Sequence, residues 1–196
     1  MKKLKYVCSI IILLLLSCND NNQKIILGSG INGLAIIEGN LVKQYVYYEN
    51  FGWREIKEYE FSLPNKYKNV FIFQLSGFAL IVGNKLNFYT YYNNDWNENQ
   101  ERQFTLPRNY KNIFVHNTGK FSIIIDNIIK HFVFYDNNWN ELDEYQFALP
   151  NNYKYVFIHY MLDYEELAIV VSNSVKYYKY DNGWQEMKNK YFTYEK

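Results

Sequence analysis

Four tryptophan–glutamate pairs are the residues whose types and spacing come closest to a chemical site in this chain. Each pair has the form Trp-x-Glu, and the pairs are Trp53/Glu55, Trp96/Glu98, Trp139/Glu141 and Trp184/Glu186. Residues two apart in a β-strand lie on the same face, so each indole would have a carboxylate beside it. An aromatic platform with a carboxylate suits sugar binding, and these eight residues are the candidate ligand-binding residues. The alternative is structural: Trp packs between repeated units, and Glu accepts a hydrogen bond from the indole or a loop.

The fourfold repetition of this pair argues against catalysis. A carboxylate acid–base pair needs two different environments that push the two pKa values apart, whereas four copies of one residue favour a structural role. The chain also has no Gly-x-Ser-x-Gly elbow, and the glycines of Gly28-Ser29-Gly30 are not followed by the Lys-Ser/Thr of a phosphate-binding loop. We therefore expect a protein that is not an enzyme, with no catalytic residues and no cofactor.

The histidines do not indicate a metal site. His116 and His159 occupy the same position of successive repeats, where the preceding repeat has Phe73. A position that accepts Phe or His is typical of a core or rim site, and His131 falls in a different part of its repeat. No Cys or His pair has the spacing of zinc ligands, so we expect no metal.

The elements that would hold these residues repeat with a period of about 43. The four tryptophans are 43, 43 and 45 residues apart, and three Leu-Pro pairs that end in Pro64, Pro107 and Pro150 are 43 residues apart. A fixed period in this range is the signature of stacked supersecondary units. The chain therefore divides into four units, at about residues 24–64, 65–107, 108–150 and 151–196.

Each unit contains four short runs rich in β-branched and aromatic residues, which predict strands. In the third unit they are Tyr110–His116, Phe121–Ile125, Ile129–Tyr135 and a run from Trp139 to Phe147. Pairs such as Gly39-Asn40, which tolerate a positive φ, separate the second and third runs, as tight hairpins require. Each unit is thus a four-stranded antiparallel meander.

Four such meanders resemble the blades of a β-propeller, in which radial repetition protects the sheet edges. The size of the domain, residues 24–196, is similar to the four-bladed hemopexin type, and we expect an all-β, four-bladed propeller. The chain begins on a first strand and ends on a fourth, so closure of the ring would depend on side-chain packing. Alternatives are an open stack of β-sheets, or half of a larger ring completed by a second chain.

The N-terminal segment has the features of an export signal. Lys2, Lys3 and Lys5 precede an apolar run of 11 residues, Tyr6–Leu16, which is too short to span a bilayer. The sequence Leu15-Leu16-Ser17-Cys18 then resembles the lipobox of bacterial lipoproteins. The resemblance implies that residues 1–17 are a signal peptide, that Cys18 carries lipid such as palmitate, and that residues 18–23 form a tether. The protein would be anchored to a membrane of the bacterial cell envelope, facing the periplasm or the cell surface.

Charge and cysteine content limit the partners. The net charge is +1, and it becomes −2 without the three signal lysines. There is no basic patch, so nucleic acid is not an expected partner. Cys8 would leave with the signal, and the body would have no disulfide. We expect a non-catalytic module that binds another envelope protein or serves as a scaffold for it. The protein could also form oligomers. The alternative function is that of a carbohydrate-binding, lectin-like propeller. A long loop at His159–Glu166 breaks the repeat and marks a candidate binding face.

Overall fold

The computed structural model describes residues 23–27, 33–74, 76–160, 165–190 and 192–193, and these residues form β-strands, turns and short 3-10 helices without any α-helix. The proposed signal peptide, Cys18 and the Gly28-Ser29-Gly30 bend lie outside the described residues. None of the described residues belongs to a helix that is long and apolar enough to cross a membrane.

The described residues form four antiparallel sheets with one plan: three strands, a short fourth strand, one turn of 3-10 helix and a two-residue strand. Sheet one contains β1 (Gln23–Leu27), β2 (Gly33–Glu38), β3 (Leu41–Tyr48), β4 (Gly52–Glu55), η1 (Lys57–Tyr59) and β5 (Phe61–Ser62). Sheet two contains β6 (Tyr67–Gln74), β7 (Gly77–Val82), β8 (Lys85–Tyr92), β9 (Asp95–Glu98), η2 (Gln100–Arg102) and β10 (Phe104–Thr105). Sheet three contains β11 (Tyr110–Asn117), β12 (Lys120–Ile125), β13 (Ile128–Tyr135), β14 (Asn138–Glu141), η3 (Asp143–Tyr145) and β15 (Phe147–Ala148). Sheet four contains β16 (Tyr153–Tyr160), β17 (Glu165–Val171), β18 (Ser174–Tyr180), β19 (Trp184–Glu186), η4 (Lys188–Lys190) and β20 (Phe192–Thr193).

The fourth run of each unit is interrupted, which the sequence analysis did not anticipate. In sheet one, β4 pairs with β3 from Gly52 to Glu55, and β5 pairs with the start of β3 through Phe61. Between them the segment Lys57–Tyr59 leaves the ladder as a 3-10 turn. The segment is polar and does not alternate, so it has no buried face to keep it in the sheet, while Phe61 returns to the core.

The hairpins between second and third strands form at the predicted turn residues. The backbone φ is +64° at Gly39, +63° at Gly83, +48° at Asp126 and +55° at Ser172. A positive φ is required by two-residue hairpins and is easiest for Gly, Asn and Asp. The turn chemistry therefore sets the register that places each second strand between its first and third strands.

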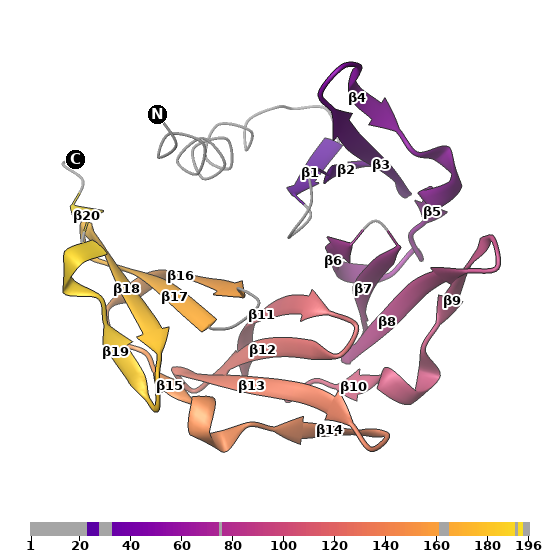
Figure 1. The fold of residues 1–196 in the computed structure, drawn as a ribbon. Helices are drawn as coiled ribbons and strands as arrows, with labels where there is room; N and C mark the ends of the chain where they lie inside the picture. The colour runs from indigo at the N-terminus through magenta and orange to yellow at the C-terminus, as the bar shows by residue number, and fades with distance from the viewer. Residues whose placement is uncertain (1–22, 28–32, 75, 161–164, 191, 194–196) are drawn as a thin grey trace.

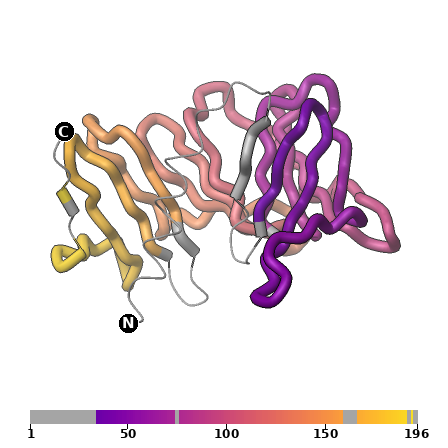
Figure 2. Tube along the Cα trace, turned by 90° about the horizontal axis from the view of Figure 1, so that it is seen from above, coloured from indigo at the N-terminus to yellow at the C-terminus, as the bar shows by residue number. Residues whose placement is uncertain are grey.

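The four sheets follow one another around a ring like four blades of a β-propeller, and the ring is open between sheet four and sheet one (Figure 1). The predicted all-β fold of four repeated antiparallel meanders is thus confirmed. The first strands β6 and β11 lie towards the middle of the ring, and the fourth strands β4, β9 and β14 lie at its rim (Figure 1). Seen from above, sheet one and sheet four lie on opposite sides of the molecule (Figure 2).

The described residues form three hydrophobic clusters, each between consecutive sheets. Phe61 of sheet one packs with Phe78 of sheet two, Phe88 packs with Phe121 of sheet three, and Ile129 packs with Leu167 of sheet four. The second strands supply nearly continuous apolar runs because both of their faces are covered. Burial between sheets is therefore what joins the four units.

The insertion in the fourth unit lengthens a hairpin. His159 pairs with Glu166, and Tyr160 pairs with Glu165, so these residues extend the β16–β17 ladder. The expected loop at His159–Glu166 is wrong for these four residues, because the added residues continue the strand pairing. The rest of that segment, residues 161–164, lies outside the described residues.

Candidate functional site

Three of the four tryptophans lie between sheets. The indole Nε1 of Trp139 donates to the backbone oxygen of Arg102, 2.9 Å away in the preceding sheet. In the same way, Trp184 Nε1 donates to the oxygen of Tyr145 at 2.9 Å. Trp96 packs against Phe61 and Phe78, but its buried Nε1 has no hydrogen-bond partner. These tryptophans join each sheet to the one before it.

Trp53 occupies the same position in sheet one, where no described sheet precedes it. Its side chain is 51% exposed, and its ring contacts Tyr47 of its own sheet edge-on at 5.4 Å between centroids. The four tryptophans are therefore equivalent in sequence but divide into three that are packed between sheets and one that faces outward.

The glutamates of the Trp-x-Glu pairs bond within their own sheets. Tyr45 and Tyr89 donate their hydroxyls to Glu55 and Glu98, each at 3.2 Å. Burial, with Glu98 beside it, raises the pKa of Tyr89 to about 12. The remaining two pairs are the ion pairs Lys130–Glu141 at 2.7 Å and Lys176–Glu186 at 3.3 Å. Glu141 also accepts from Gln146 Nε2 at 2.8 Å, in the loop after η3, as the structural alternative expected. In no described case does the glutamate accept from the indole of its own pair.

A buried polar group in sheet three links two histidines. Ser122 Oγ lies 2.9 Å from His116 Nε2 and 2.9 Å from His131 Nδ1. The hydroxyl can donate to one ring and accept from the other when both rings are neutral. Burial lowers the pKa of His131 to about 4 and that of His116 well below 6.5. At the matching positions sheet two has Phe73, Ala79 and Phe88, so an apolar core also fits this location.

Exposed tyrosines form a row that the sequence analysis did not single out. We call Tyr48, Tyr92 and Tyr135 the tyrosine row; each is the last residue of the third strand of its sheet. Their side chains are 43%, 67% and 53% exposed. Because the three sheets repeat one plan, the row occupies the same corner of successive sheets. An alignment of the repeats would have revealed this row, because in each of these units a tyrosine directly precedes the turn between the third and fourth strands.

Asparagine side chains close the hairpins at two members of the tyrosine row. Asn93 and Asn94 have φ of +53° and +61°, as a tight turn between two strands requires. Asn97 Nδ2 then donates to the oxygens of Tyr92 and Asp95, both at 3.0 Å. In sheet three Asn140 Nδ2 makes the corresponding bonds, to Tyr135 at 3.2 Å and to Asn138 at 2.9 Å. These bonds close the hairpins that carry Tyr92 and Tyr135.

Acidic side chains accompany the tyrosine row. Glu49 follows Tyr48, Asp95 pairs with Tyr92 across the turn, and Asp136 follows Tyr135. All three carboxylates are exposed. Tyrosine rings with neighbouring carboxylates attract the guanidinium and ammonium groups of Arg and Lys through cation–π and ionic contacts.

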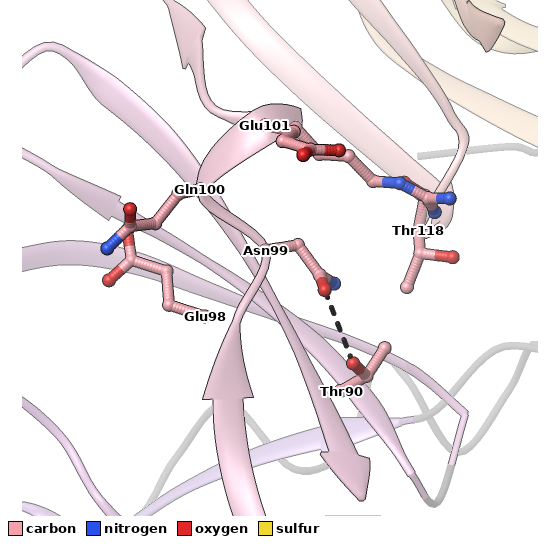
Figure 3. A pocket seen from close by; sticks show the side chains of 7 residues that line it. Thr90, Glu98, Asn99, Gln100, Glu101 and Thr118 are labelled. Atoms are coloured by element: carbon pink, nitrogen blue, oxygen red, sulfur yellow. Dashed lines mark hydrogen bonds between the residues drawn. The ribbon is translucent and has the colours of Figure 1, made fainter. Parts of the chain in front are cut away.

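An open hollow of about 710 Å³ lies where sheets two and three meet (Figure 3). Its lining is polar: Thr90, Glu98, Asn99, Gln100, Glu101, Arg102 and Thr118. Thr90 Oγ1 donates to Asn99 Oδ1 at 3.5 Å, and Arg102 Nη1 donates to the Thr118 oxygen at 3.1 Å. In Figure 3 the dashed line between Asn99 and Thr90 marks the first of these bonds. The arginine side chain thus already bridges the two sheets, and its other face lies over the Phe134 ring.

Comparison with known proteins identifies the fold. No protein-family description matches the chain, and no curated protein matches it. Among solved structures, it is similar to the fission yeast SREBP-SCAP binding domains, at 13% identity and a TM-score of 0.50, covering 88% of this chain and 49% of that one. It is also similar to a proposed 6-phosphogluconolactonase from Bacteroides fragilis, at 9% identity and a TM-score of 0.49, covering 88% and 55%. The chain therefore spans about half the length of these structures. At such identities the similarity concerns the fold alone.

Proposed function

We propose that this protein is a non-catalytic, protein-binding module and that the tyrosine row is its binding surface. The observation that carries the proposal is the placement of Tyr48, Tyr92 and Tyr135 at equivalent, exposed positions. Tyrosine buries a large area at a low cost in side-chain entropy, and it is enriched in protein interfaces. The repeated plan spreads the three rings over three sheets, which suits an extended protein surface.

The chemistry of the surface indicates the kind of partner. The carboxylates of Glu49, Asp95 and Asp136 flank the rings, so a partner segment with exposed Arg or Lys fits it best. The contact would weaken with ionic strength, because rim charges are screened by salt. The asparagine bonds that close two of the three hairpins favour the proposal, since a preorganised binding surface loses little entropy on association.

A matched pair of triple variants tests this function. Replacing Tyr48, Tyr92 and Tyr135 with Ser removes the row from exposed positions, so the fold should be kept. The control replaces Asn65, Arg108 and Asn151 with Ser; these residues follow the three Leu-Pro pairs and are also exposed. After in-cell crosslinking and purification, the wild type and the control should retain the same discrete protein, and the row variant should lose it. Equal retention by all three proteins would contradict the proposal.

A carbohydrate-binding site is the second candidate, and the exposed indole of Trp53 favours it. Glu55 lies two residues away and is held by Tyr45, so one Trp-x-Glu pair offers both a platform and a carboxylate. Glycan-array binding that is lost in Trp53→Ala and kept in the tyrosine-row variant would support a lectin. No binding to any glycan would exclude this site.

We further propose that the module is anchored through lipid on Cys18 to a membrane of the bacterial cell envelope. The support is the lipobox-like sequence that precedes Cys18. A tether of five residues after the cysteine spans at most about 17 Å, which would keep the module close to that membrane. Labelling with a radioactive fatty acid should be seen in the wild type and lost in Cys18→Ala. Labelling that persists in Cys18→Ala would contradict the anchor.

A further inference from the structure

The contacts between consecutive sheets repeat a fixed pattern, which begins with the residue that closes each 3-10 turn. This residue packs on the aromatic ring at the equivalent place in the next sheet. Tyr59 contacts Tyr91 at 4.9 Å between ring centroids, the Arg102 guanidinium lies 5.1 Å from the Phe134 centroid, and Tyr145 stacks on Tyr180 at 4.1 Å. An aromatic or cationic group therefore covers this ring at all three described junctions.

The indole is the second part of the pattern. The backbone oxygen of the same closing residue accepts from the tryptophan of the next sheet, as in Trp139 to Arg102 and Trp184 to Tyr145, both at 2.9 Å. At the first junction the backbone oxygen of Tyr59 accepts a hydrogen bond from Gln44 Nε2 instead, at 3.2 Å. Trp96 then packs at the same place without that bond.

The third part is an aromatic residue on the first strand. Phe71 of β6 packs against the cluster between sheets two and three, and Phe114 of β11 packs against the cluster between sheets three and four. Each middle sheet thus presents one half of the pattern to the sheet before it and the other half to the sheet after it.

Sheets one and four each carry one half of this contact pattern with no described sheet packed against it. Tyr47 and Trp53 of sheet one, which match Phe134 and Trp139, are 43% and 51% exposed. We call these two residues the leading face. Phe157 of sheet four matches Phe114 and is 53% exposed. Lys190 closes the turn η4 as Arg102 closes η2, and its ammonium pairs with Glu166 of the same sheet at 2.9 Å. We call Phe157 and Lys190 the trailing face.

We propose that the leading face of one copy binds the trailing face of a second copy, so that two chains complete one ring. Trp53 would donate its indole N–H to the Lys190 oxygen of the other copy. The Lys190 ammonium, which pairs with Glu166 of its own sheet at 2.9 Å in the single chain, would turn to lie over Tyr47, as Arg102 lies over Phe134. A second copy is the favoured occupant because this chain carries both complementary halves of a contact that it makes three times internally. Such a head-to-tail contact closes when the rotation between copies is 180°.

The proportions of the chain agree with this assembly. This chain covers 49% of the chain of the fission yeast domains to which it is similar, so two copies together have about the length of that chain. The two-fold axis would run along the axis of the ring. A rotation about this axis does not move any residue along the axis, so the N-termini of both chains would lie on the same side of the ring. The inference does not depend on the tyrosine row, which lies at the hairpin tips.

Engineered cysteines test the contact in the full chain. Cys8 and Cys18 are the two cysteines of the sequence, and replacing both with Ser leaves only introduced thiols. One protein carries Tyr47→Cys, and a second carries Lys190→Cys. Mixed under mild oxidation, they should form a disulfide-linked dimer, whereas each alone should not. A third protein carries both cysteines in one chain. If the two faces meet within one copy, this protein forms an internal disulfide and keeps the mass of a monomer.

The mass in solution provides the second measurement. In mild detergent, analytical ultracentrifugation of the wild type should give twice the mass of one copy, which is measured on the same protein under denaturing conditions. Trp53→Arg should dissociate it, and Tyr92→Ser, a control from the tyrosine row, should leave it dimeric. A monomeric wild type, crosslinking only within one chain, or a series of larger masses would overturn the two-copy ring. A dimer that persists in Trp53→Arg would overturn the assigned contact.

Discussion

The indole N–H of Trp139 donates to the backbone oxygen of Arg102 at 2.9 Å, and this bond ties sheet three to sheet two. The same indole lies 4.8 Å from the ring of Phe121 and 5.2 Å from that of Phe134. One residue of the Trp-x-Glu column therefore combines apolar burial with a directional bond across the junction. At this junction the column therefore adds a directional bond to the apolar burial that joins the units.

Replacing Trp139 with Phe should cost more stability than replacing Trp96 with Phe. Both changes remove similar volume, but only Trp139 has a hydrogen bond to lose, and its loss leaves the oxygen of Arg102 without this donor. The difference should be about 1 kcal/mol in the free energy of unfolding. Urea denaturation of the two variants measures it. Equal losses, or a larger loss for Trp96→Phe, would contradict the assigned bond.

The buried ring of Phe121 should contribute more to the free energy of unfolding than an exposed aromatic ring. Phe121 is fully buried and contacts Phe104, Phe132 and Trp139. Phe121→Ala should lower the free energy of unfolding by about 3–5 kcal/mol, because it opens a cavity between two sheets. Phe51→Ala, at an exposed hairpin tip, is the control and should change it by less than about 0.5 kcal/mol. Thermal and urea unfolding measure both, and similar effects would argue against this core.

Stability should fall as the pH drops from 6.5 towards 4. His131 is 1% exposed, and its pKa of about 4 in the folded protein lies below the ordinary 6.5. In that window the unfolded chain binds a proton that the folded chain does not, so acid favours unfolding. Above pH 6.5 this effect is absent. The loss should approach about 3 kcal/mol near pH 4, at 1.36 kcal/mol for each pKa unit.

A swap between repeats isolates this effect. The triple variant His116→Phe, Ser122→Ala and His131→Phe gives sheet three the residues that sheet two has at Phe73, Ala79 and Phe88. Its loss of stability between pH 6.5 and 4 should be smaller by at least that amount, because both imidazoles with a lowered pKa are removed. Denaturation at several pH values compares the two proteins. An unchanged pH dependence would show that the histidines do not cause it.

The sequence predicts much of the fold because the repeat supplies four independent readings of each element. Phe121–Ile125 was expected as a strand and is observed as Lys120–Ile125. The 3-10 turns escaped prediction, since a polar segment such as Lys57–Tyr59 is compatible with a loop or a solvent-facing strand. The different exposure of Trp53 and Trp139 also could not be predicted from the shared motif, because it depends on whether another sheet precedes the residue.

The candidate site was less predictable than the fold. The regular spacing of the Trp-x-Glu pairs suggested a binding site, yet three of the tryptophans pack at the junctions between sheets. The tyrosine row has the same period, but its exposure depends on the hairpin geometry fixed by residues such as Asn97 and Asn140. Sequence shows that these tyrosines recur, and only the structure shows which of the chain's 21 tyrosines face solvent at the tips.

Site-specific photo-crosslinking in the native cell tests the proposed binding surface most directly. A photoreactive phenylalanine analogue placed at Tyr92 or Tyr135 should yield one discrete crosslinked protein, of the same identity at both positions. The analogue placed at Arg108, an exposed position after a Leu-Pro pair, should not yield it. No crosslinked protein from either tyrosine position, or the same product from Arg108, would contradict the conclusion that the tyrosine row binds a protein partner.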